Sequence, residues 1–324
     1  MINIRTDLAI EARDMYTKEN KRELDGVIVD EEKEGDIKIT TVTIESDEAG
    51  KELGKPKGNY ITIDFPEFTH YDGESMDNVS KVVDNVLTRL VNMPEEKTAL
   101  VVGLGNWNVT PDSLGPKVTE KIMVTRHLKQ VMPEAIDDSV RPVCCISPGV
   151  LGITGIETGE IIKSLVDKIK PDLVICIDAL GSRKLERVNR TIQISDTGIS
   201  PGAGVGNHRM KINEETLGVK VVAIGVPTVV HAATIANDTI DLVLDGLINQ
   251  AEKGKEFYNM LKSVDKIEKS QLIKEVLDPF VGDLMVTPKD VDAVIESLAK
   301  IIANGINMAI QPNLDMEDIN KFMN

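Results

Sequence analysis

Two acidic residues stand where a carboxylate can do chemistry. Asp178 directly follows the apolar run Leu173–Ile177, and Asp112 lies in a polar loop after the apolar run Ala99–Leu104. Short continuous apolar runs are typical of strands buried on both faces, and in such sheets ligands bind beyond the carboxyl ends of the strands. If the first and third parallel strands are neighbours, we expect the two carboxylates to converge at that edge.

A convergent pair of carboxylates favours hydrolysis. The two groups resist double ionisation and share a proton, so one acts as acid while the other is a base that activates water against a peptide carbonyl. This interpretation predicts that the reaction is favoured by mild acid, because a doubly ionised pair is incompetent. The alternative is that both carboxylates ligate a divalent metal ion.

Other motifs give weaker indications. Gly103-Leu104-Gly105 begins a dinucleotide pattern, but Asn108 stands where the third glycine is needed, so NAD binding is disfavoured. Turn geometry accounts for these glycines. His208 lies in a glycine-rich loop that can line a site, and His231 follows another apolar run at the same edge. We find no Ser/His/Asp or Cys/His grouping.

The elements that must position these residues follow an α/β pattern. A hairpin is expected within residues 24–45 and a strand at 60–63, which together form a β-rich segment at about 24–65. A helix is expected at 75–92. Four buried strands are expected at 99–104, 143–146, 173–177 and 219–226, separated by helices that include 116–131, one capped at Thr154 and one after His231. A charged helical insertion at about 250–278 precedes a C-terminal helix that Thr287 caps. The pattern predicts a three-layer sandwich with a mostly parallel, mixed central sheet and a small N-terminal β-rich segment.

Composition narrows the class of protein. The chain has 324 residues with 37 basic and 53 acidic side chains, a net charge of −16. This charge argues against nucleic acid and anionic membranes as partners, and no run of ~18 apolar residues predicts a membrane span. Three cysteines do not make a disulfide framework. We therefore expect a cytoplasmic protein without a structural metal.

Long blocks of the sequence resemble one family, the germination proteases of spore-forming bacteria. The matching blocks include RTDLAIEARD, VVGLGNWNVTPDSLGPKV, RPVCCISPGVLGITGIETGEII and PDLVICIDALGSRKLERVNRTIQISDTGISPGAGVGNHR. The resemblance implies an endopeptidase for small acid-soluble spore proteins, made as a zymogen and assembled as a homotetramer in the spore core, with a fold similar to hydrogenase maturation proteases. It implies an atypical aspartic mechanism without a cofactor, in which the two catalytic aspartates fall on Asp112 and Asp178.

The resemblance also points to a self-cleavage site. Family targets are cut between an acid and a large apolar residue, in a pattern similar to Thr-Glu-Ile-Ala-x-Glu, and residues 6–11 read TDLAIE. We expect cleavage between Asp7 and Leu8, which divides the chain into a propeptide, 1–7, and a single peptidase domain, 8–324. The propeptide is shorter than the resemblance leads us to expect, and His231 stands where an acid is expected.

Basic side chains are candidates for reading the acid of a substrate, since a buried carboxylate favours a guanidinium partner. The candidates are Arg183, Lys184, Arg187 and Arg209, with His208 beside them; solvated loop charges are the alternative for each. Two rival functions remain open: a metal-dependent peptidase of the same fold, and a non-catalytic module that binds spore proteins. The N-terminal residues 1–20 are expected to form an exposed arm, helical after Leu8.

Overall fold

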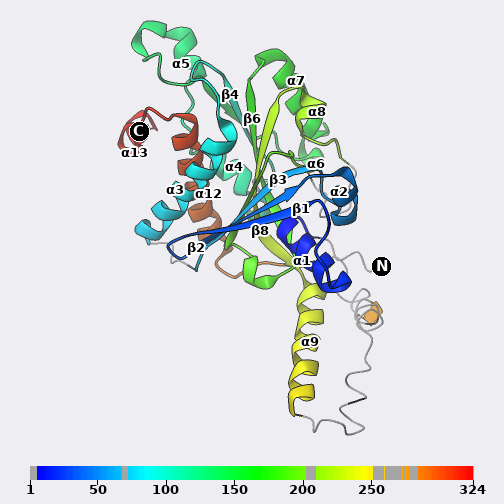
Figure 1. The fold of residues 1–324 in the computed structure, drawn as a ribbon. Helices are drawn as coiled ribbons and strands as arrows, with labels where there is room; N and C mark the ends of the chain where they lie inside the picture. The colour runs from blue at the N-terminus through cyan, green and yellow to red at the C-terminus, as the bar shows by residue number, and fades with distance from the viewer. Residues whose placement is uncertain are drawn as a thin grey trace.

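The computed structural model describes residues 6–67, 72–201, 209–250, 259, 272, 275–276 and 284–323. Within this part of the chain, nine strands form one sheet in the order β1-β2-β3-β7-β8-β6-β4-β5, with β9 paired to β8 (Figure 1). The strands are β1 (Val27–Glu34), β2 (Ile37–Ile44), β3 (Gly58–Asp64), β4 (Ala99–Gly103), β5 (Val143–Ile146), β6 (Leu173–Ser182), β7 (Thr191–Ser195), β8 (Lys220–His231) and β9 (Met285–Val286).

The α/β class and the mixed central sheet are confirmed, but the balance of strand directions is different from the expected one. Strands β5, β4, β6 and β8 run parallel, whereas the pairings from β8 through β7 and β3 to β1, and that of β9, are antiparallel. The connection between β6 and β7 spans only residues 183–190, too few for the crossover that a strand parallel to β6 requires, so β7 runs antiparallel to β8, the strand beside β6. The N-terminal hairpin is therefore part of the central sheet through β3 and β7.

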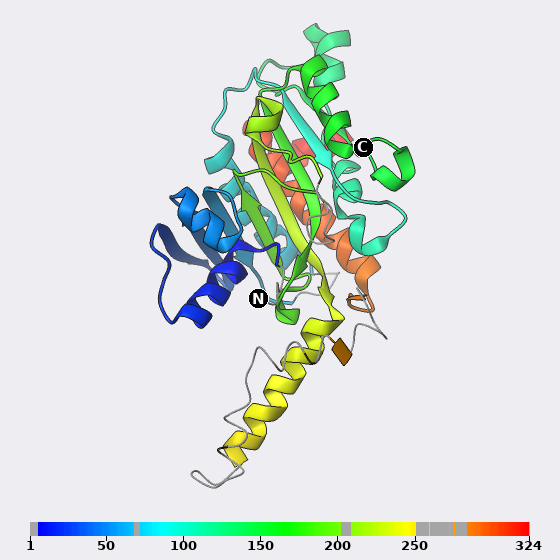
Figure 2. The same ribbon diagram turned by 90° about the vertical axis from the view of Figure 1, so that its right-hand side faces the viewer.

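Helices cover both faces of this sheet (Figures 1 and 2). Alternate residues of β6 enter different cores: Ile175 and Ile177 join the core under one set of helices, while Val174 and Cys176 join the opposite one. The first set is α3 (Gly73–Val91), α4 (Leu114–Thr119) and α12 (Val291–Ile310). The second is α7 (Thr158–Ile169) and α8 (Glu214–Leu217) over the parallel strands, with α1 (Ala9–Asn20) and α2 (Asp47–Leu53) over the antiparallel ones.

In the described part of the chain, the remaining helices are α5 (Arg126–Val131), α6 (Leu151–Thr154), α9 (Ala232–Gln250), α13 (Met316–Met323) and the short 3-10 helices η1 (Thr110–Asp112), η2 (Pro133–Ala135) and η3 (Leu185–Arg187). Helix α9 extends away from the body of the protein (Figures 1 and 2). Helix α12 is long and apolar enough to cross a membrane, but 72% of that stretch is buried inside the protein, as suits a core helix.

Several expected boundaries were wrong. The single helix expected at 116–131 is two helices, α4 and α5, separated by residues 120–125. Thr154 ends α6, and α7 begins only after Glu157, so Thr154 does not cap it. The Thr287 hydroxyl donates to the carbonyl of Thr228 instead of capping α12, which begins at Val291. Most of the expected insertion at 250–278 lies outside the described residues.

The N-terminal arm is buried, not exposed, at residues 8–10. Leu8, Ala9 and Ile10 are at most 7% exposed, and they pack in one core with side chains of β2, β3 and β6, among them Leu180. Helix α1 follows as expected. A tripeptide buried this deeply fixes the position of the residues just before it, which lie beside the carboxyl end of β6.

Candidate active site

Asp178 lies on β6 at the centre of the sheet, on the face covered by α1 and α7. Strand β6 pairs with β4, which confirms that the first and third parallel strands are neighbours. The Asp178 residue is 8% exposed, and its carboxylate accepts a hydrogen bond from the backbone N–H of Ala179 (2.9 Å).

Asp112 reaches the same edge through a tight loop after β4. Gly105 has φ +112°, and a Cβ there would lie 2.0 Å from the carbonyl oxygen of Asp112, so only glycine admits this approach. The Asn106 N–H donates to that same carbonyl oxygen (3.0 Å). The Thr228 hydroxyl of β8 donates to the carbonyl of Pro111 (2.7 Å). The glycines that resembled a dinucleotide motif therefore hold the Asp112 loop against the sheet.

The two carboxyl groups, hereafter the acid pair, interact electrostatically. Burial raises the pKa of Asp112 to about 6, against smaller lowering effects of a backbone hydrogen bond and of Arg209. Burial and the charge of Asp112 raise the pKa of Asp178 well above its usual range, and Asp7 raises it further. The acid pair therefore holds a proton at pH values where isolated aspartates are ionised.

Both carboxyl groups line one cavity of about 650 Å³. Arg209 and His231 line it as well, and so do Thr6 and Asp7 from the chain's own N-terminal segment. The sequence therefore brings together in one space the two acids and the residue expected to precede the cleaved bond.

Asp7 pairs with the end of β6. Its backbone N–H donates to the carbonyl of Gly181 (3.2 Å), and the Gly181 N–H donates to Asp7 Oδ2 (2.8 Å). Gly181 follows Asp178 by three residues, which explains why the charge of Asp7 affects the pKa of Asp178.

Two side chains hold the peptide bond between Asp7 and Leu8. The Lys55 ammonium donates to the carbonyl oxygens of Thr6 (3.0 Å) and Asp7 (2.9 Å). The Gln193 amide donates through Nε2 to the Asp7 carbonyl (3.2 Å) and accepts through Oε1 from the Ala9 N–H (2.7 Å). The carbonyl of the expected cleavage site thus receives two side-chain hydrogen bonds.

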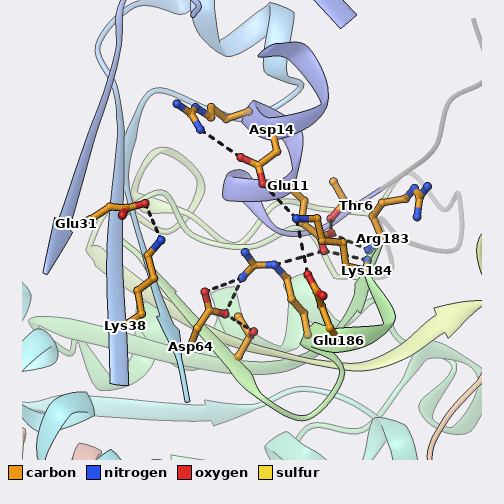
Figure 3. A network of polar contacts seen from close by, with 12 residues as sticks. Thr6, Glu11, Asp14, Glu31, Lys38, Asp64, Arg183, Lys184 and Glu186 are labelled. Carbon is orange, nitrogen blue, oxygen red and sulfur yellow. Dashed lines mark hydrogen bonds and ion pairs between the residues drawn. The ribbon is translucent and has the colours of Figure 1, made fainter. Parts of the chain in front are cut away.

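Glu11 is held in what we term the acid cradle, which lies beside Arg183 and Lys184 (Figure 3). The cradle is formed by the backbone N–H groups of Arg183 and Lys184 and by the Arg187 guanidinium. The Arg183 and Lys184 N–H groups donate to the Glu11 carboxylate at 2.6 and 3.0 Å, and Arg187 Nε lies 3.7 Å from it. The Thr6 hydroxyl also donates to this carboxylate. Because Glu11 is 1% exposed, these partners replace the water that its carboxylate loses on burial.

Comparison with known proteins identifies the family of this chain. The germination protease family model matches residues 6–254 and 245–323. The chain belongs to the germination protease family. It is 70% identical to a germination protease of Clostridium perfringens and 60% identical to that of Clostridium tetani, in both cases over the full length of each chain. The Bacillus cereus germination protease is 43% identical, with 98% of this chain and 96% of that protein covered. The expected resemblance and the endopeptidase class are confirmed.

In this germination protease family member, the expected basic residues lie in three different places. The Arg183 guanidinium pairs with Asp238 (2.6 and 2.5 Å), so Arg183 reaches Glu11 only through its backbone. Arg187 pairs with Asp64 (2.6 and 2.9 Å) and approaches Glu11. Arg209 lies at the acid pair, where it lowers the pKa of both groups. His208 lies outside the described residues.

Sequence reasoning missed Lys55 and Gln193. Gln193 belongs to β7, whose alternation of Thr191, Gln193 and Ser195 with two buried isoleucines is a period-2 signal that predicts a strand. Lys55 lies in the loop after α2 and carries no local signal. Among the described residues, no group of three or more His, Cys, Asp or Glu side chains is arranged to hold a metal ion.

Proposed function

We propose that this chain is a self-processing endopeptidase in which the acid pair hydrolyses the Asp7–Leu8 bond. The observation that carries the proposal is that Thr6 and Asp7 line the same cavity as the acid pair, with Asp7 bonded to the end of β6. The full chain is then a zymogen, with 1–7 as propeptide and 8–324 as the peptidase domain.

In the proposed reaction, water attacks the carbonyl carbon of Asp7. One member of the acid pair accepts a proton from the water while the other, protonated member donates one to the leaving nitrogen of Leu8. The raised pKa of Asp178 supports a shared proton, because the charge of Asp112 disfavours ionisation of Asp178. This is an atypical aspartic mechanism that needs no cofactor.

The same cavity is proposed to bind small acid-soluble spore proteins, so that the acid pair begins their degradation during germination. Asp7 corresponds to the substrate acid before the cleaved bond, and Leu8 corresponds to the large apolar residue after it. Glu11 corresponds to the second acid of the pattern. Since Thr6 and Asp7 already line this cavity, a substrate in trans has to displace the chain's own N-terminal segment. We further propose a homotetramer in the spore-core cytoplasm, without nucleic acid or membrane partners.

The proposal is tested with a synthetic peptide that contains TDLAIE and is incubated with the purified protein. We expect one cut, between Asp and Leu, that a chelator does not prevent. Loss of cleavage with a chelator and its return with a divalent ion would support the metal-dependent alternative instead. Binding of the peptide without cleavage at any pH would support the non-catalytic alternative.

A further inference from the structure

Two side chains contact the Asp7–Leu8 peptide group but have no function in the mechanism proposed for the acid pair. Hydrolysis of an amide develops negative charge on the carbonyl oxygen, and donors aimed at that oxygen are a large source of catalysis. The Asp7 carbonyl oxygen has two such donors, Lys55 Nζ at 2.9 Å and Gln193 Nε2 at 3.2 Å. Lys55 lies in none of the blocks quoted for the family resemblance, and Gln193 lies in one of them without having been a candidate site residue.

We propose that Lys55 and Gln193 are catalytic residues that stabilise the oxyanion formed at the Asp7 carbonyl, and at the corresponding carbonyl of a substrate. This inference rests on the proposed self-cleavage. Gln193 spans the bond, since its Nε2 donates to the Asp7 carbonyl while its Oε1 accepts from the Ala9 N–H. Lys55 adds the positive charge.

The position of Gln193 in the sheet agrees with this role. Gln193 pairs with Gly225 in the register of β7 and β8, and Gly225 pairs with Asp178 in the register of β8 and β6. Ile192 and Ile194 enter the opposite core, so the Gln193 side chain leaves the sheet on the same face as Asp178. The Asp7 carbonyl that Gln193 holds therefore lies on the same face of the sheet as Asp178.

The Lys55 ammonium is partly desolvated and lies near two carboxylates. Burial lowers the pKa of Lys55, and the carboxylates of Asp7 and Glu11 oppose that shift. Desolvation makes the attraction between an ammonium and an oxyanion stronger than in water. The neighbouring Lys51 and Lys57 are exposed and offer matched controls.

The proposed step balances. Water adds to the Asp7 carbonyl carbon and loses a proton to one member of the acid pair, while the electron pair of the C=O bond moves to the oxygen held by Lys55 and Gln193. When the C=O bond reforms, the C–N bond breaks and the Leu8 nitrogen leaves with the proton that the other acid donates. Neither Lys55 nor Gln193 exchanges a proton in this sequence.

The test compares Lys55→Met, Lys55→Arg, Gln193→Glu and the control Lys57→Met. Gln193→Glu removes the donor to the carbonyl but keeps an acceptor for Ala9. In the full chain, we expect the rate of cleavage between Asp7 and Leu8 to fall ~10²-fold or more in Lys55→Met and Gln193→Glu, with partial recovery in Lys55→Arg. Lys57→Met should match the wild type.

A second readout separates catalysis from anchoring. On the TDLAIE peptide, loss of oxyanion stabilisation lowers kcat with little change in KM, whereas an anchoring role raises KM alone and would overturn the inference. If Lys55→Met does not fold by thermal melting, Gln193→Glu carries the test. Unchanged rates in both variants, with normal wild-type cleavage at Asp7–Leu8, would overturn the inference alone. Absence of that cleavage in the wild type would overturn the proposed function as well.

Discussion

Asp178 and Gln193 lie on the same face of the sheet, two strands apart, because both are in register with Gly225 of the strand between them. Their Cα atoms are thus about 10 Å apart, twice the spacing of neighbouring strands. One side chain belongs to the acid pair, and the other holds the Asp7 carbonyl (3.2 Å). The N-terminal segment and the acid pair are brought together by this register.

The pH dependence of self-cleavage follows from the acid pair. The competent pair holds one proton, and the pKa of Asp112 is raised to about 6, so cleavage should decline below about pH 6 as both groups become protonated. It should also decline at higher pH, once Asp178 ionises. In place of a simple preference for mild acid, we expect a bell-shaped dependence of the cleavage rate on pH, with its acid limb near pH 6.

The profile is measured as the first-order rate of cleavage between Asp7 and Leu8 at constant ionic strength. Asp167→Asn, which changes an exposed surface acid, should keep the same profile. A rate that stays constant from mild acid to well above neutral pH is incompatible with a shared proton.

The acid pair should also cost stability at neutral pH. A carboxyl group whose pKa is raised in the fold binds its proton more tightly there than in the unfolded chain, so its stabilising effect is present at low pH and is lost as the pH rises through the folded pKa. For Asp112 this loss extends from about pH 4 to about pH 6, and for Asp178 it extends further. Asp178→Asn keeps a neutral group at every pH.

Asp178→Asn should therefore melt above the wild type at pH 8, by about 2–4 °C for each kcal/mol of stability gained, and by much less at pH 4. Thermal unfolding followed by circular dichroism at both pH values tests this. Asp167→Asn serves again as the surface control. If Asp178→Asn melts below the wild type at pH 8, the raised pKa of Asp178 is wrong.

Much of this architecture could be predicted from local patterns, and the reasons for the failures are physical. The convergence of Asp112 and Asp178 follows from two buried parallel runs and the usual neighbours in such sheets. The direction of β7 depends on the length of its connection from β6. The burial of Leu8 depends on a core assembled from β2, β3 and β6. The short apolar run near the N-terminus does not itself indicate that these strands will pack against it.

The groups that contact Glu11 could be predicted only in part from side-chain type. A search for basic side chains selects Arg183 and Lys184, and both do contact Glu11, but through their backbone N–H groups. The Arg183 guanidinium is occupied by Asp238. Side-chain type predicts which residues carry charge, whereas backbone donors depend on the conformation of the loop after β6.

The acid cradle predicts an effect of Glu11→Gln. The variant keeps the shape of the side chain but loses the charge that strengthens its hydrogen bonds to Arg183 and Lys184. We expect self-cleavage to slow about 10-fold, as the loss of a charge-assisted hydrogen bond implies. Glu19→Gln, on the exposed end of α1, should cleave at the wild-type rate.

The same change can be made in a substrate. A peptide with TDLAIQ in place of TDLAIE should be cut with a lower kcat/KM by a similar factor. Equal rates for the two peptides, together with normal self-cleavage of Glu11→Gln, would mean that the acid cradle has no part in recognition.

Gly105→Ala tests the loop that positions Asp112. An added Cβ would lie 2.0 Å from the Asp112 carbonyl oxygen at a backbone φ of +112°, so the loop has to move. We expect at least a ~10-fold loss of cleavage rate, since acid–base catalysis contributes a factor of about 10²–10⁴ that depends on position. Gly35→Ala is the control, because Gly35 has φ +60° and nothing within 4 Å of an added Cβ. A Gly105→Ala protein as active as Gly35→Ala would show that Asp112 need not be held in this position.

The central claim, that the acid pair hydrolyses the bond that the fold brings to it, is tested most directly by the intact mass of the full chain after incubation. The wild type and Asp167→Asn should lose residues 1–7 and begin at Leu8. Asp112→Asn and Asp178→Asn should each retain them, with cleavage slowed at least ~10²-fold. Removal of residues 1–7 at the wild-type rate in either variant, or a new N-terminus elsewhere in the wild type, would contradict the account.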